Sequence, residues 1–175
     1  TELAGSIPDS KIAAMATSKL TGDIAYANMP AGSVVQVEYH RHEGQETYSI
    51  SSASGGAYSN VQDIITPRFA SSKILVIISL DGVTWTSDGS YGHFRVKRSV
   101  GGTPTQIGTF GYPRQWSSVD NSSGVTMSSI LYDSPNTTSA ITYLFDFYSN
   151  SGTSNFNINR DGSGDSSITL MEIAQ

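Results

Sequence analysis

The feature that most constrains this chain is a long series of short β-strand patterns separated by turns, which runs from Ser33 to the carboxyl terminus. In SVVQVEYHRH, the side chains of Val35, Val37 and Tyr39 alternate with polar ones, and this period of two predicts a strand with one buried face. In SKILVIISL (72–80), the run from Ile74 to Leu80 is nearly all aliphatic, which predicts a central strand covered on both faces. About ten such patterns without convincing helices indicate an all-β sandwich or barrel. We predict a jelly-roll-like β-sandwich head over residues 33–175, since a jelly roll packs such a series into two sheets.

Composition excludes several classes of function. Charged residues make up only 14% of the chain, and Ser, Thr, Asn and Gly, which suit turns and exposed strand faces, supply much of its polarity. The formal net charge of −5 gives no electrostatic basis for general nucleic-acid binding. No apolar run approaches the roughly 18 residues of a membrane-spanning helix, so we expect no membrane insertion. The absence of cysteine excludes disulfides, thiolate metal sites and cysteine nucleophiles.

One later strand pattern predicts a charged surface. In GHFRVKRSV (92–100), Phe94 and Val96 alternate with His93, Arg95 and Lys97. Because successive strand residues point to opposite sides, the two apolar residues are expected inside and the three basic ones on a solvated face.

Residues 1–32 differ from the rest of the chain. SIPDSKIAAMATSKLTG (6–22) repeats itself imperfectly, and it lacks the length and the aromatic residues of a domain core. Its apolar side chains are Ile7, Ile12, Met15 and Leu20. The segment is either a linker with a few incidental apolar positions or a helix over 9–20, which Asp9 or Ser10 would cap. Even a helix with this apolar stripe would need partners to bury it.

Three stretches resemble the distal fibre domains of tailed bacteriophages, of the marine type. GSIPDSKIA and TSKLTG resemble the repeats of tail-fibre shafts, and ITPRFASSKILVIISL (65–80) resembles a recurring stretch of the distal domains. NRDGSGDSSITLMEIAQ (159–175) is similar to their closing strand. The resemblance implies a homotrimeric fibre tip in the virion, with residues 1–32 as the end of the shaft and a β head that contacts the host surface. Three chains around one axis would then bury Ile7, Ile12, Met15 and Leu20 together.

The pair His40 and His42 is a candidate metal site. Residues i and i+2 of a strand project from the same face. Near a threefold axis, three copies would offer their imidazoles to one transition metal such as Fe, Zn or Ni, and the resemblance implies that some fibres carry His-x-His iron sites of this kind. The alternative is a polar strand face in water. No other cofactor is expected.

Aromatic and polar residues in two irregular segments are candidate receptor contacts. Loops on a rigid scaffold commonly carry recognition, and aromatic rings offer flat faces to sugars and proteins. The candidates are Tyr91, His93, Tyr112, Arg114, Gln115 and Trp116. For Tyr112 and Trp116, a contact between subunits is the open alternative.

The sequence favours binding over catalysis. It contains no GxSxG, HExxH or phosphate-binding loop motif, and its carboxylates show no local pairing for glycoside hydrolysis, so we expect no enzymatic activity. The function expected from the resemblance is non-catalytic attachment to a bacterial surface glycan or outer-membrane protein. The alternatives are a structural virion component, such as a capsid decoration or a trimerisation tip, and a glycan-degrading spike, which the short chain disfavours.

Overall fold

The computed structural model describes residues 26–50, 59–85, 92–110, 124–149, 154–162 and 164–175. Most of the predicted shaft segment therefore lies outside the described residues. Its last part contains the short 3-10 turn η2 (Tyr26–Asn28). The chain then joins the body of the molecule, because Gly32 N–H donates to Ala174 O (2.8 Å) and Ala174 N–H donates to Ser33 O (2.9 Å).

The described part of the chain is built almost entirely from antiparallel strands, which confirms the all-β prediction. The strands are β1 (Val34–Glu43), β2 (Glu46–Ile50), β3 (Asp63–Ile65), β4 (Lys73–Trp85), β5 (Gly92–Ser99), β6 (Thr105–Phe110), β7 (Val125–Asp133), β8 (Ile141–Ser149), β9 (Ser154–Ile158) and β10 (Asp165–Ile173). A second 3-10 turn, η3 (Arg160–Gly162), connects β9 to β10. In these residues no helix has the length and apolar character needed to cross a bilayer.

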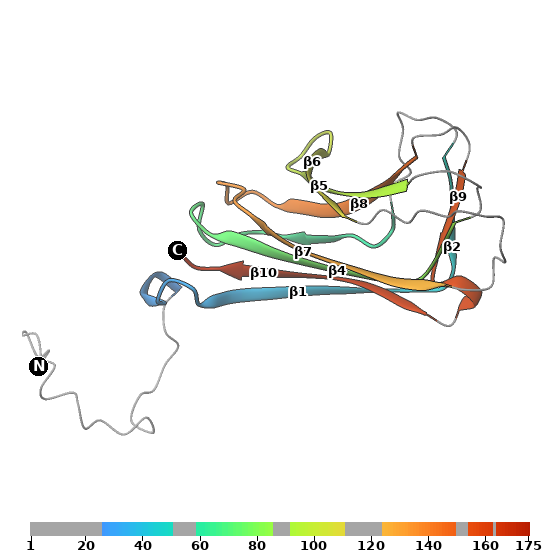
Figure 1. The fold of residues 1–175 in the computed structure, drawn as a ribbon. Helices are drawn as coiled ribbons and strands as arrows, with labels where there is room; N and C mark the ends of the chain where they lie inside the picture. The colour runs from blue at the N-terminus through green and yellow to red at the C-terminus, as the bar shows by residue number, and fades with distance from the viewer. Residues whose placement is uncertain (1–25, 51–58, 86–91, 111–123, 150–153, 163) are drawn as a thin grey trace, which may run out of the picture.

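The strands pair in a nested order. The first strand pairs with the last, β1 with β10, and inside that pair lie β3 with β8, β4 with β7 and β5 with β6. The further pairs β10–β4 and β5–β8 join these into two sheets (Figure 1). We call β1-β10-β4-β7 the first sheet and β3-β8-β5-β6 the second sheet, while β9 pairs with the end of β4 and with β2.

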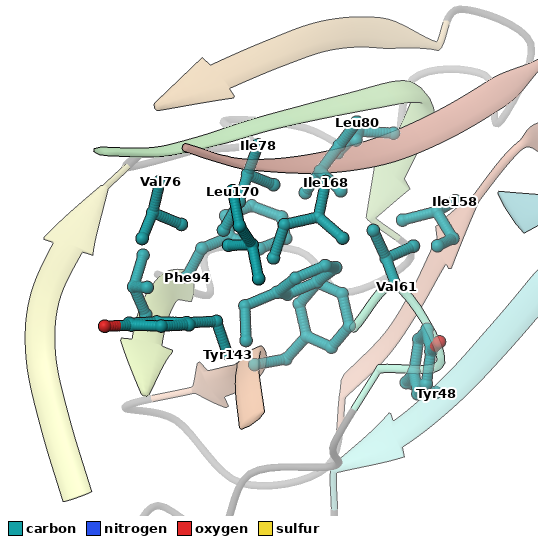
Figure 2. Close-up of a cluster of buried hydrophobic side chains, with 14 of the residues drawn as sticks. Tyr48, Val61, Val76, Ile78, Leu80, Phe94, Tyr143, Ile158, Ile168 and Leu170 are labelled. Carbon is teal, nitrogen blue, oxygen red and sulfur yellow. The ribbon is translucent and has the colours of Figure 1, made fainter. Parts of the chain in front are cut away.

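The core lies between the two sheets. Figure 2 shows Val76 and Leu170 of the first sheet pointing toward Tyr143 of the second. Aromatic rings join the strands, since the Phe156 ring lies 3.9 Å from that of Phe147 and 4.7 Å from that of Phe94, centroid to centroid. Fully buried large side chains are Tyr143, Phe94, Phe145, Phe147, Phe156, Ile65, Ile74, Ile78, Leu80, Ile141 and Ile158. Tyr48 is buried as well.

The prediction for β1 was wrong about which side chains face inward. Val35 is buried, but Val37 and Tyr39 are 50% and 61% exposed, whereas the polar residues between them are half-buried. The cause is a register shift between Val34 and Gln36. Such an irregularity adds one residue to the strand and reverses the side to which all later side chains point.

The prediction that the Ile74–Leu80 strand is covered on both faces is met on one face only. Ile74, Val76, Ile78 and Leu80 are buried in the core. Leu75 and Ile77, on the opposite face, are half-buried, because only their neighbours within the sheet shield them. No other part of the chain that the structure describes covers the outer face of this central strand.

The basic face predicted on β5 is not solvated. Phe94 and Val96 are buried as expected, but Arg95 and Lys97 are half-buried around the fully buried carboxylate of Asp146 on β8. Arg95 donates to it from Nε (2.7 Å) and Nη2 (2.6 Å), and Lys97 Nζ lies 2.6 Å away. The reason is register, because Arg95 and Asp146 are direct partners across β5 and β8. A carboxylate that no local pattern reveals therefore neutralises these cations.

A glycine allows β4 to change partners. The pairing with β7 shifts register between Leu80 and Val83, and beyond this point β4 pairs with β9. Gly82 lies here with φ +54°, and a Cβ atom on it would come within 2.6 Å of the Arg160 backbone nitrogen. Both the backbone conformation and the space exclude a side chain.

We predict that Gly82→Ala lowers the free energy of unfolding by about 2 kcal/mol or more, because it combines a left-handed conformation with a backbone clash. Urea denaturation followed by fluorescence measures the change. Gly102→Ala is the matched control, since a Cβ atom there meets nothing within 4 Å. Equal stability of the two variants would contradict the prediction.

Burial also determines the behaviour of Tyr143. Its hydroxyl donates to Asp133 Oδ2 (2.7 Å), and Asp133 is held by Arg98 at 2.9 Å. Burial, followed by this hydrogen bond to a carboxylate, raises the pKa of Tyr143 far above its ordinary value.

Because the folded state favours the protonated phenol, its contribution to stability is complete below about pH 10 and is lost as the pH rises above that value. The unfolding free energy should decline as the pH rises above about 10. We predict that Tyr143→Phe makes this decline shallower, because the variant removes about one proton from the difference in proton binding between the folded and unfolded states. Urea titrations at several alkaline pH values measure it. Tyr26→Phe, at a phenol that is 45% exposed, should leave the slope unchanged, and equal slopes for wild type and Tyr143→Phe would count against the argument.

Candidate functional site

Most of the predicted site residues lie outside the described residues. These are the receptor candidates Tyr91, Tyr112, Arg114, Gln115 and Trp116, together with the axis candidates Ile7, Ile12, Met15 and Leu20. His93 lies on β5, where its backbone is in register with Tyr148 of β8. The roles assigned to all ten residues stay predictions.

His40 and His42 share a face of β1, as predicted, but the structure gives them different surroundings. His42 Nε2 lies 3.1 Å from Glu46 Oε1, and the side chain of Asn60 donates to the same oxygen. His40 instead lines a surface hollow with Asp63 and Thr142. No cluster of three or more His, Asp or Glu side chains suited to a metal ion occurs in the described part of one chain. A metal bound between copies of the chain stays a prediction.

A polar groove runs between β1 and the segment around β3. It consists of two adjoining open hollows of about 420 and 410 Å³, and Ile64 lines both. We call it the β1–β3 groove. The first hollow is lined by Gln36, Glu38, Ile64, Thr66, Pro67 and Arg68, and the second by His40, Asn60, Gln62, Asp63, Ile64 and Thr142.

A buried carboxylate fixes one wall of the groove. Glu172 of β10 is fully buried and accepts hydrogen bonds from Gln36 Nε2 (2.6 Å) and from the backbone N–H groups of Arg68 (2.8 Å) and Phe69 (3.2 Å). Gln36 Nε2 also donates to Thr66 O (2.7 Å). These bonds provide the buried carboxylate of Glu172 with hydrogen-bond donors. They also connect the 66–69 segment to β1 and β10, so this wall of the groove is held by the strands of the first sheet.

Several polar side chains of the groove are available to a ligand. The side chains of Glu38, His40, Gln62 and Thr142 make no hydrogen bond or ion pair with any other residue that the structure describes. Together they present carboxylate, imidazole, amide and hydroxyl groups, which both donate and accept hydrogen bonds. The side chain of Ile64, 55% exposed, adds one apolar contact between the hollows. The carboxylates of Glu38 and Asp63 outnumber the one guanidinium, that of Arg68, so such a surface suits a neutral ligand rich in hydroxyl or amide groups better than an anion.

The sequence patterns did not single out this groove. β3 has only three residues, and its neighbours carry no motif. One signal was available, because adjacent strand residues point to opposite sides. Of Ile64 and Ile65, only one can therefore enter the core, and the other must lie on the surface. The structure buries Ile65 and exposes Ile64.

Comparisons with known proteins do not assign this chain to a family. No protein-family model matches the chain, and no curated protein matches it. One solved structure with a similar backbone is the "Structure of infectious bursal disease virus Gx strain", with a TM-score of 0.37 and 9% sequence identity. The match covers 87% of this chain and 42% of that chain, so this chain spans less than half the length of that protein.

Proposed function

We propose that this chain is the head of a virion tail fibre, which associates as a homotrimer and attaches to a glycan or protein of a bacterial surface without catalysing a reaction. The observation that carries the proposal is the β1–β3 groove. It offers unpaired hydrogen-bonding side chains on a framework that buried bonds hold in place. A rigid polar surface of this kind binds a ligand with little loss of conformational freedom.

The nested strand order supports a jelly roll as the finer description of the fold. Four antiparallel pairs, enclosed one within the next, correspond to one long hairpin that rolls up into two sheets. The resulting orders β1-β10-β4-β7 and β3-β8-β5-β6 are those expected of such a roll, with β2 and β9 as an addition. Jelly rolls occur in viral structural proteins and in lectins, which agrees with a binding role in a virion.

A structural virion component without receptor binding is the second candidate function. The observation that favours it is the exposed apolar surface on β1 and β7, because large exposed apolar side chains that gather on one face commonly mark a protein contact. Direct binding to cells separates the two functions.

We predict that fluorescently labelled protein binds cells of at least one strain in a panel of bacteria that includes marine isolates. Replacing two groove side chains together, His40→Ala with Gln62→Ala, should weaken this binding about thirtyfold, because each of the two lost hydrogen bonds is worth roughly 1 kcal/mol. Cell-bound fluorescence against protein concentration measures the effect. Thr103→Ala, at an exposed turn position outside the groove, is the control.

Two results would count against the proposal in different ways. Wild-type protein that binds no strain, while remaining folded, would favour the structural role. Binding that the groove variant leaves intact would support attachment but exclude the β1–β3 groove as the receptor site.

A further inference from the structure

The first sheet has an outer face that no part of the described chain covers. Across antiparallel strands, residues that are direct partners project from the same side of the sheet. The registers of β1, β10, β4 and β7 therefore define rows of outward side chains. One row is Val37, Met171, Leu75 and Tyr132, and the next is Tyr39, Thr169, Ile77 and Ile130. Val34, Ile173 and Lys73 extend the face as a third row. We call these three rows the outer face.

The outer face is apolar where a solvated surface would be polar. Ile130 is 71% exposed and Tyr132 50%, which adds to the exposed Val37 and Tyr39 on the opposite rim. Lys73 is the one charged residue in the three rows, and its Nζ lies 5.4 Å from the centre of the Tyr132 ring. The following row, which contains Arg41, Ser167, Ser79 and Ser128, is polar and ends the patch. This arrangement is not scattered surface hydrophobicity but a bounded patch.

The size of the patch fits the centre of a protein interface. Four strands about 4.8 Å apart and three rows about 7 Å apart cover roughly 400 Å². Exposed apolar patches of this area on a monomer are commonly functional. The area is also about half of the surface that one partner buries in a standard protein interface. An apolar centre of this size with a polar rim is the usual anatomy of a contact between proteins.

We propose that the outer face packs against the outer faces of two further copies of this chain around a threefold axis. The charge distribution permits a copy as the partner. The chain carries a net charge of −5, so copies repel one another in general, but the outer face contains no carboxylate and is where they can approach with least repulsion.

The two rims of the face also match each other. The β1 rim presents Val37 and Tyr39, and the β7 rim presents Ile130 and Tyr132, so each rim has one aliphatic side chain and one tyrosine. Rotation about a threefold axis brings one rim of each copy to the other rim of the next. The outward side of β4, half-buried in one chain, then becomes fully covered. This inference rests on the association in the proposed function, but it is independent of attachment to a host.

The absence of cysteine allows a clean test by engineered cross-linking. Under mild oxidation, the full chain carrying both Tyr39→Cys and Ile130→Cys should form covalent trimers on non-reducing gels, because residue 39 of each copy meets residue 130 of the next. The control is Tyr39→Cys combined with Val100→Cys, an exposed residue that follows β5 of the second sheet, and it should not form trimers. A covalent dimer as the only product, or no specific product, would overturn the threefold packing.

Solution mass provides the second measurement. Light scattering should give about three times 18.6 kDa for the wild-type chain, and Ile130→Glu should weaken the association about tenfold to a hundredfold, since it places a charge where an apolar side chain is buried between copies. Val100→Glu should leave the mass unchanged. Because Ile130 is largely exposed in one chain, its variant should keep the wild-type circular dichroism spectrum.

The outcomes separate the two proposals. A wild-type trimer that persists in Ile130→Glu overturns the outer-face packing but leaves the association intact, and residues 1–32 are then the contact expected from the sequence. A monomeric wild type overturns both the association and this inference, whereas attachment is decided by the cell-binding measurement alone.

Discussion

The pairing of β4 on both of its edges is the constraint on which the rest of this structure depends. β10 and β7 flank it, β1 pairs with β10, and the second sheet packs against this sheet across the core. Because β4 is aliphatic at successive positions, apolar side chains project from both of its faces. Ile74, Val76 and Ile78 form part of the core, while Leu75 and Ile77 face outward. The same strand therefore explains both the packing of a single chain and the contact that we propose between chains.

Buried charge adds specificity to this apolar framework. Asp146 and Glu172 are both fully buried, and removing their charges from water would be costly without partners. Asp146 obtains two cationic side chains from β5, and Glu172 obtains backbone and side-chain donors from the 66–69 segment and from β1. Each set of bonds forms in one register only, so the carboxylates favour one alignment of strands over slipped alternatives.

The sequence predicted the class of fold well because strand patterns and turns are local properties. It failed where a distant residue or a one-residue irregularity decides the outcome. The register shift before Gln36 exposes Val37 and Tyr39, and no alternation of residue types reveals it. Arg95 and Lys97 were expected in water because their partner, Asp146, lies on another strand far along the chain. The β1–β3 groove was missed for the same reason, since its two walls come together only through the fold.

The order of pairing has a consequence for biosynthesis. Arg41 of β1 bonds to Asp165 of β10, 124 positions later, and β10 also occupies the place between β1 and β4. During translation, β1 and β4 therefore keep unpaired hydrogen-bonding edges until β10 has been synthesised. Because the pairing of β10 joins residues far apart in the sequence, it is expected to make folding slow. A nascent polypeptide that stops before β10 keeps these edges exposed and is prone to aggregate or be degraded. Completion of the first sheet therefore depends on translation through β10.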